Sequence, residues 1–125
     1  MAKKILVIDD EELITRTFCN LLEKKGLEVL IAKRNEDAIA LVEESNFDMI
    51  ISDIRMPGEN GVQTIREIKK MLELQKRKKP SVIFITGYSD NKLEDEAKEL
   101  GCVAFLYKPF ESEELFSAIN RGLKK

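Results

Sequence analysis

Four sets of polar residues stand where short apolar runs of this chain end, and their side chains are carboxylates, a hydroxyl and an ammonium. The sets are Asp9 with Asp10, Asp53, Thr86 and Lys108. If the apolar runs are parallel strands, all four sets meet at one edge of a sheet, where open α/β sheets place their ligands. The pattern therefore predicts one site built from residues that are far apart in the sequence.

The residue types narrow the chemistry of that site. Three carboxylates at one edge repel one another, so either their pKa values rise or a cation joins them. The chain has no histidine and two cysteines, which excludes an internal Cys/His zinc site and a histidine-based triad. Oxygen ligands alone favour a hard ion, and we expect Mg²⁺, with Mn²⁺ as the alternative. Carboxylates with Mg²⁺ are typical of phosphoryl transfer.

In phosphoryl transfer a carboxylate can act as the nucleophile and form an acyl phosphate. Lys108 would contact the phosphoryl group as a point charge, and the Thr86 hydroxyl would donate a hydrogen bond to it. Gly87 leaves room for phosphate to approach the backbone.

Short apolar runs alternate five times with longer segments of helical period, which predicts βαβ units around a parallel sheet. The predicted strands are 5–8, 27–32, 48–52, 81–86 and 102–107. Helices are expected at 11–25, after an N-cap at Asn35, from Gly61, over 91–100, and after an N-cap at Ser112. The stripe of the first helix includes Leu13, and only three apolar residues anchor 91–100, so this helix should be the most loosely held.

The strands are apolar on both sides, which indicates a sheet covered by helices on both faces. With right-handed crossovers this gives an α/β fold, a three-layer α/β/α sandwich, and the pattern leaves the strand order open. At 125 residues the chain is expected to be a single domain, 1–125.

Composition limits the partners. The formal net charge is −2, so no global field attracts nucleic acid or membrane. The basic run Lys76–Lys79 lacks interleaved aromatics and is interpreted as a solvated turn.

The amino-terminal apolar run is too short for a signal peptide or membrane span, and a cytoplasmic protein is expected. Cys19 and Cys102 are interpreted as reduced, small apolar residues.

Together these motifs resemble the receiver domain of two-component response regulators. They are Asp9-Asp10, Asp53 followed by Met56-Pro57-Gly58, Thr86-Gly87, and Lys108-Pro109-Phe110. The resemblance covers essentially the whole chain. It implies a flavodoxin-like fold with a five-stranded parallel sheet of order 2-1-3-4-5.

The resemblance also implies that Asp53 accepts a phosphoryl group from a histidine kinase or histidine phosphotransfer protein, so the domain signals rather than acting as an enzyme. Asp10 and Asp53 would bind Mg²⁺ directly, with the Arg55 backbone carbonyl as a third ligand and Asp9 acting through water. The peptide bond before Pro109 is usually cis in this family.

Phe105 matches the family's switch aromatic, which responds to movement of the threonine. Tyr107 should point to the same face as Phe105, because side chains alternate along a strand. Arg55 and Tyr88 match positions that tune phosphate lifetime, and we hypothesise that this bulky pair slows decay. The expected readout face comprises the fourth helix, the fifth strand and the last helix, for an output domain, a target protein or a dimer partner.

Two alternatives remain at this stage. Haloacid-dehalogenase-like phosphatases also form an aspartyl phosphate, yet they need an acid two residues after the nucleophile, where this chain has Arg55. The other alternative is a receiver-like scaffold that is no longer phosphorylated, which the intact acidic cluster, Thr86 and Lys108 oppose.

Overall fold

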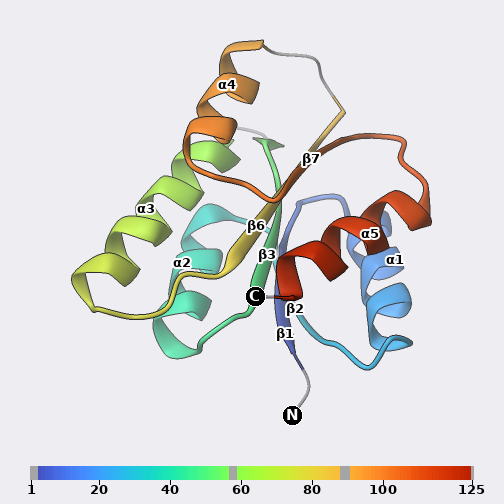
Figure 1. Cartoon of the computed structure of the whole chain (residues 1–125), viewed down its shortest axis with the longest axis horizontal. Helices are drawn as coiled ribbons and strands as arrows, with labels where there is room; N and C mark the ends of the chain where they lie inside the picture. Colours follow the sequence, from blue (N-terminus) through green and yellow to red (C-terminus); the bar gives the residue numbers. More distant parts are fainter. Residues whose placement is uncertain (1–2, 57–58, 88–90, 125) are drawn as a thin grey trace.

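The computed structural model describes residues 3–56, 59–87 and 91–124 as a parallel sheet between two layers of helices (Figure 1). The sheet has the order β2-β1-β3-β6-β7, which is the predicted 2-1-3-4-5 when its own strands are counted. Its strands are β1 (Lys4–Ile8), β2 (Glu28–Ala32), β3 (Met49–Asp53), β6 (Ser81–Thr86) and β7 (Ala104–Tyr107). The helices are α1 (Glu12–Glu23), α2 (Asn35–Glu44), α3 (Gly61–Leu74), α4 (Asn91–Glu99) and α5 (Ser112–Leu123).

Each face of the sheet has its own hydrophobic core, which confirms the three-layer sandwich. On one face α2, α3 and α4 cover residues such as Leu6, Ile50 and Phe84. On the other face α1 and α5 cover the alternate residues, among them Val7 and Ile51. Every residue from Ile5 to Ile8 is fully buried, because the two sides of this strand face different cores.

A short hairpin after β3 was absent from the sequence prediction. Strands β4 (Arg55–Met56) and β5 (Glu59–Asn60) pair antiparallel and return the chain to the edge of the sheet. Asn60 then caps α3, since its side chain accepts a hydrogen bond from the Val62 N–H at 2.9 Å. The hairpin therefore sets where α3 begins relative to the end of β3.

Three local predictions were wrong by small amounts. The N-cap of α2 is Arg34, and Asn35 is the first helical residue. The N-cap of α5 is Glu111 rather than Ser112, and the Glu111 N–H donates to the Glu114 carboxylate at 3.2 Å. Leu13, placed on the apolar stripe of α1, is 76% exposed. Cap positions depend on backbone dihedrals that composition does not determine.

Helix α4 is the most thinly anchored helix, as predicted. Ala97 is its single buried residue, whereas α3 buries six. Each large apolar side chain that is fully buried contributes about 1.5–3 kcal/mol, so α4 gains much less from packing than α3. No helix within the described residues is both long and apolar enough to cross a membrane.

Candidate functional site

Three aspartates meet at the carboxyl edge of the sheet, as the sequence predicted. Asp9 follows β1 directly, Asp10 comes next, and Asp53 is the last residue of β3. Each offers a carboxylate oxygen, and these oxygens lie within 4.8 Å of one another. Asp9 is fully buried and Asp53 is 3% exposed, while Asp10 faces solvent. The cluster therefore has a buried interior and an open side.

Lys108 extends from the end of β7 into this cluster. Its ammonium donates to Asp53 Oδ2 at 3.0 Å and to Asp9 Oδ2 at 3.2 Å. A third bond goes to Glu11 Oε1 at 3.1 Å. One ammonium thus serves three carboxylates, and with Asp10 beside them the edge keeps an excess of negative charge.

The pKa values reflect this crowding. Burial is the main reason why the pKa of Asp9 lies above its ordinary value, although the Glu11 N–H and the Lys108 charge oppose the shift. Burial alone would lower the pKa of Lys108, but its hydrogen bond to Asp53 and the charges of Asp9 and Asp53 raise the pKa overall. Lys108 is therefore a permanent cation at neutral pH.

The backbone around Asp53 is held by close packing against Gly61. The Gly61 N–H donates to the Ile54 carbonyl at 2.7 Å. A Cβ atom at position 61 would lie 2.1 Å from the carbonyl oxygen of Asp53, closer than any real contact. Glycine at the start of α3 therefore allows the hairpin to bring this helix against the Asp53 backbone.

Aromatic stacking fixes the loop that carries Lys108. The rings of Phe110 and Phe18 stack with their centroids 5.9 Å apart, which joins this loop to α1. The Lys108–Pro109 peptide bond is cis, as the family resemblance implied. The Lys108 N–H donates to the Thr86 carbonyl at 2.7 Å. Lys108 is therefore held from both α1 and β6.

Thr86, the predicted switch ring of Phe105 and the ring of Tyr107 lie beside this site. Thr86 ends β6 and is 2% exposed. Phe105 is half-buried, and its ring lies 6.5 Å from Phe84 and 5.2 Å from Tyr107. Both β7 rings thus share one face, as predicted, and the Tyr107 hydroxyl donates to Glu94 of α4. These contacts connect the strand next to Thr86 to the thinly anchored helix.

The donor set suits a hard divalent cation. Asp9, Asp10 and Asp53 supply oxygen atoms only, close enough together to share one ion, and such sets prefer Mg²⁺ over softer metals. The buried carboxylates already need positive charge, which Lys108 supplies in part. The side chains present therefore fit the ion that the sequence predicted.

Sequence reasoning missed two residues of the site, Glu11 and Gly61, and two residues that it predicted there cannot be compared with the structure. Glu11 directly follows the aspartate pair, and this position was the available signal for its bond to Lys108. Gly61 gave no signal, because its role depends on the hairpin. Tyr88 lies outside the described residues, and for Arg55 only the backbone, in β4, is described.

Comparisons with known proteins agree with this geometry. The family described as "Response regulator receiver domain" matches residues 5–120. The "Probable transcriptional regulator ycf29" of Pyropia yezoensis is 34% identical over 120 residues, which is 96% of this chain and 53% of that protein. The chain thus spans about half the length of this curated relative.

Solved structures show the same arrangement. A response regulator receiver domain protein from Clostridium thermocellum is 35% identical, with a TM-score of 0.84 over 97% of this chain and 94% of that one. Vibrio cholerae chemotaxis protein CheY4 is 28% identical, with a TM-score of 0.86 over 98% and 100%.

A third solved structure bears on the chemistry. A response regulator from Burkholderia pseudomallei, 28% identical with a TM-score of 0.80 over 93% and 65%, is described with a phosphorylated aspartic acid, a calcium ion and citrate. The fold, the acidic edge and the family match lead to one assignment. This chain belongs to the response regulator receiver domain family, the signalling domains of two-component systems that are phosphorylated on aspartate.

Proposed function

We propose that Asp53 is the phosphoacceptor of this receiver domain and that a histidine kinase or histidine phosphotransfer protein is its donor. The observation that carries the proposal is the position of Asp53. It is a buried strand-end carboxylate that accepts a hydrogen bond from Lys108 and lies beside two further aspartates. Asp9 is also buried at a strand end, but it is the backbone carbonyl of Asp53 that packs against Gly61 at the start of α3.

In the proposed reaction a carboxylate oxygen of Asp53 attacks the phosphorus of a phosphohistidine. A P–O bond forms, the P–N bond to the donor imidazole breaks, and the imidazole leaves with the electron pair. Lys108 stays charged and contacts the phosphoryl oxygens, and the Thr86 hydroxyl donates to one of them. The domain positions reactants and balances charge, and the absent imidazole comes from the donor.

Asp10, Asp53 and the Arg55 carbonyl would hold Mg²⁺, or Mn²⁺ in its place, with Asp9 acting through water. The ion would supply positive charge that reduces repulsion between the acidic edge and the incoming phosphoryl group. Lys108 alone leaves that repulsion incompletely balanced, because it already serves Asp9, Glu11 and Asp53.

Intact mass after incubation with acetyl phosphate and Mg²⁺ tests the acceptor. We expect the wild type to gain one phosphoryl group and Asp53→Asn to gain none. Asp10→Asn serves as the matched control, because it should slow the reaction through the metal while keeping the acceptor. No mass gain in the wild type would favour the phosphorylation-independent scaffold instead.

A phosphatase of the haloacid-dehalogenase type is the weaker alternative. It requires an acid two residues after the nucleophile, and that residue is Arg55. Turnover of added phosphate esters would be needed to support it, and we expect none.

A groove beside Lys108 supports a protein as the donor. It has a volume of about 540 Å³ and lies between α1 and the loop that follows β7. Its lining includes the exposed Leu13 with Phe18 and Pro109, so an apolar face of the donor can rest there while its histidine approaches Asp53. Leu13→Ser should slow phosphotransfer from a kinase and leave labelling by acetyl phosphate unchanged.

We propose that phosphorylation changes the conformation of the face formed by α4, β7 and α5. The new charge, about −1.5 to −2 by analogy with phosphoserine, would draw Thr86 and allow the Phe105 ring to move inward, a population shift of a bistable element. Hydrogen exchange with and without beryllofluoride should differ over residues 91–107. Unchanged exchange there would contradict the switch.

Phosphate lifetime and output complete the proposal. Arg55 and Tyr88 would slow hydrolysis, so Arg55→Ala and Tyr88→Ala should shorten the lifetime measured by loss of mass. The target is an output domain or protein, and the Pyropia relative, named a probable transcriptional regulator, makes transcription the first output to test. We propose the cytoplasm as the compartment, because Cys19 and Cys102 are free cysteines and reduced cysteines are typical of proteins there.

A further inference from the structure

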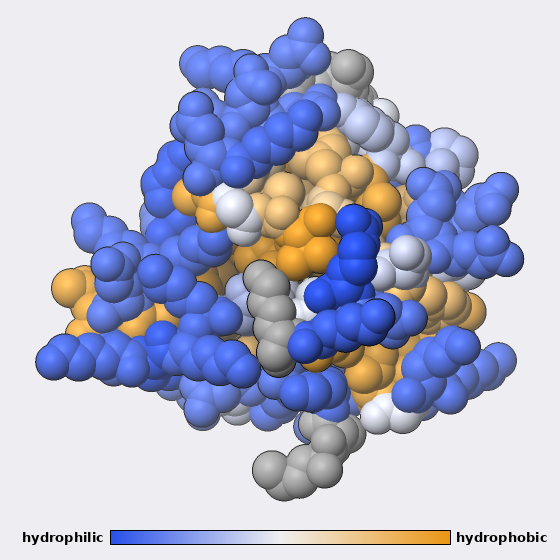
Figure 2. Space-filling model, in the orientation of Figure 1, coloured by the Kyte–Doolittle hydropathy of each residue, from blue (hydrophilic) through white to orange (hydrophobic). Residues whose placement is uncertain are grey.

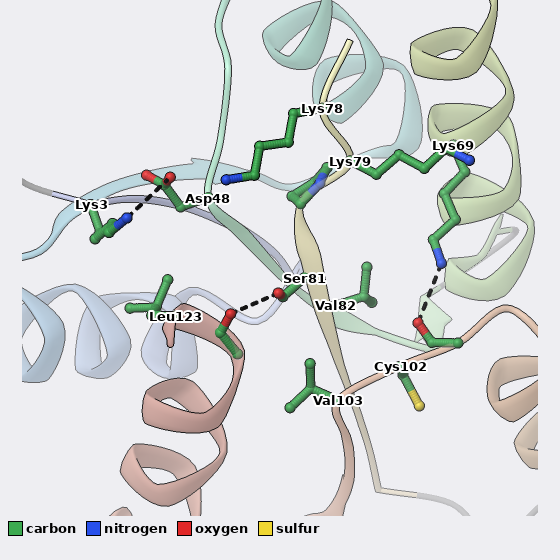
Figure 3. Close-up of a pocket in the computed structure, with 13 residues that line it drawn as sticks. Lys3, Asp48, Lys69, Lys78, Lys79, Ser81, Val82, Cys102, Val103 and Leu123 are labelled. Atoms are coloured by element: carbon green, nitrogen blue, oxygen red, sulfur yellow. Dashed lines mark hydrogen bonds and ion pairs between the residues drawn. The ribbon is translucent and has the colours of Figure 1, made fainter. Parts of the chain in front are cut away.

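A pocket of about 400 Å³ opens at the amino edge of the sheet, at the opposite ends of the strands from Asp53. Its floor comes from the start of β6, the approach to β7 and the end of α5, where the partly exposed Val103 and Leu123 lie beside Ser81 and the buried Val82 (Figure 3). This volume lies within the usual range of small-molecule sites, roughly 300–1,000 Å³. The pocket is separate from the acidic cluster.

Four lysines and one acid surround this floor. They are Lys3, Lys69, Lys78, Lys79 and Asp48. Figure 3 shows Lys3, Lys78 and Asp48 on one side of the pocket and Lys69 on the other, with the apolar floor between them. In a chain with a net charge of −2, this concentration of ammonium groups produces a local positive potential.

The ammonium groups of Lys3, Lys78 and Lys79 are only weakly neutralised within the described residues. Lys3 lies 4.0 Å from Asp48, and Lys79 lies 3.6 Å from Glu73, in pairs exposed to solvent. Lys69 is held differently, because it donates to the carbonyls of Leu100 and Gly101. Lys78 makes no ion pair with any residue that the structure describes. Exposed pairs of this kind are weak, about 0–1 kcal/mol, so an incoming anion can compete for these lysines.

Figure 2 shows, in the orientation of Figure 1, a hydrophobic area at the centre of this side of the molecule, bordered by hydrophilic residues. We propose that the pocket binds a small phosphorylated molecule with an apolar or aromatic body. The phosphates would contact the lysines, and the body would lie on Val103 and Leu123. The basic turn that includes Lys78 and Lys79 is then one wall of a binding site.

The shape favours a small molecule over nucleic acid. Single-stranded nucleic acids need an extended basic groove with aromatic stacking platforms, and the described residues that line this pocket include no aromatic side chain. A concave apolar floor with charges at its rim is instead typical of sites for small ligands.

Titration with adenosine triphosphate, followed by two-dimensional NMR without divalent ions, tests the proposal. We expect saturable shifts at Ser81, Val82, Val103 and Leu123, with a dissociation constant of about 1 mM or tighter. Adenosine and inorganic triphosphate should each bind more weakly, since each lacks one half of the interaction. No saturable shift at these residues, or equal binding of inorganic triphosphate, overturns the proposal.

Two controls lie within the chain. Lys78→Ala combined with Lys79→Ala should weaken binding about tenfold, from two exposed charges worth up to ~1 kcal/mol each, while the exposed Lys70→Ala should not change it. Bound ligand should also slow alkylation of Cys102, which lines the pocket, and leave Cys19 unaffected, because Cys19 lies outside it. Equal weakening by Lys70→Ala would show that the effect depends only on the overall positive charge, and it would contradict a site in this pocket. Asp53→Asn should bind as the wild type does, so this test is independent of phosphorylation.

Discussion

The two edges of the sheet carry charges of opposite sign, which are buried at the carboxyl edge and exposed at the amino edge. At the carboxyl edge Asp9 and Asp53 are buried, and Lys108 holds them at 3.0–3.2 Å. At the amino edge Lys3 and Lys79 are exposed and lie 4.0 and 3.6 Å from their acidic partners. Buried charges must be placed accurately because desolvation makes errors costly, whereas exposed charges tolerate loose geometry.

The largest expected difference between the two edges is in the free energy of unfolding that is lost when a glycine is replaced by alanine. In Gly61→Ala the new Cβ meets the Asp53 carbonyl at 2.1 Å, and backbone cannot easily yield. In Gly122→Ala the nearest atom, at 2.2 Å, is the end of the Met49 side chain, which can rotate away. We expect losses of about 3 kcal/mol or more and about 1–2 kcal/mol respectively in the free energy of unfolding.

Urea denaturation measures both losses, and Gly87→Ala provides the control. Its Cβ would have a nearest neighbour at 4.0 Å, the Lys108 Cδ, so its effect should stay within about 0.5 kcal/mol. A cost at position 122 that equals the cost at position 61 would remove the difference in rigidity between the edges.

Removing the shared cation tests the buried charges directly. Lys108→Met leaves Asp9, Glu11 and Asp53 without their ammonium partner. In the absence of Mg²⁺ we expect the free energy of unfolding to fall by about 2–4 kcal/mol, because buried carboxylates are then left without a paired charge. Lys78→Met at the amino edge should cost less than about 0.5 kcal/mol. Equal small losses would show that Asp9 and Asp53 are better hydrated than their burial indicates.

The sequence predicted the fold well because its signals were local. Five apolar runs and the helical periods between them determined the sandwich, and the polar residues at the strand ends located the site. Strand order followed only from the family resemblance, because periodicity does not say which strands are neighbours. The two-residue strands β4 and β5 are too short to show any period.

What the sequence could not provide was contact between distant residues. Leu13 fits the apolar period of α1, yet its side chain is 76% exposed, because period alone does not reveal what lies opposite a helix face. The turn at Lys76–Lys79 was interpreted as solvated, and only the fold brings Lys3 and Lys69 around the same pocket. Gly61 acquires its role in the same way.

Adding Mg²⁺ should strengthen the carboxyl edge alone. A ligand at a hundredfold excess over its dissociation constant stabilises the folded state by about 2.7 kcal/mol, so the melting temperature of the wild type should rise with Mg²⁺ and fall again with a chelator. The same addition should have little effect on Asp53→Asn, which loses a charged ligand. Equal stabilisation of both proteins would place the ion elsewhere.

Helix α4 connects the two edges, and Lys69 holds its end at the amino edge. In Lys69→Ala the bonds to the Leu100 and Gly101 carbonyls are lost, and net hydrogen bonds of this kind contribute about 1 kcal/mol. Amide exchange in α4 should accelerate about fivefold, while Lys70→Ala should leave it unchanged. Acceleration that spreads equally to α3 would indicate global destabilisation rather than release of α4.

At the carboxyl edge α4 is held by the bond from Tyr107 to Glu94. This bond should be lost both at low pH, where Glu94 is protonated, and at high pH, where Tyr107 is deprotonated. That bond, and then Lys98, lowers the pKa of Glu94 from its ordinary 4.5, so this contribution is present above pH 4.5 and is lost as the pH falls through the lowered pKa. The same bond raises the pKa of Tyr107 from 10.0, so its contribution is present below pH 10.0 and is lost as the pH rises through the raised pKa.

NMR shifts of α4 should therefore be level between these limits and change beyond each. Tyr107→Phe should lose the alkaline change and weaken the acid one, and Glu94→Gln should lose the acid one. An identical profile in Tyr107→Phe would mean that α4 is held at this edge by packing alone, leaving Lys69 as its only polar tether among the described contacts.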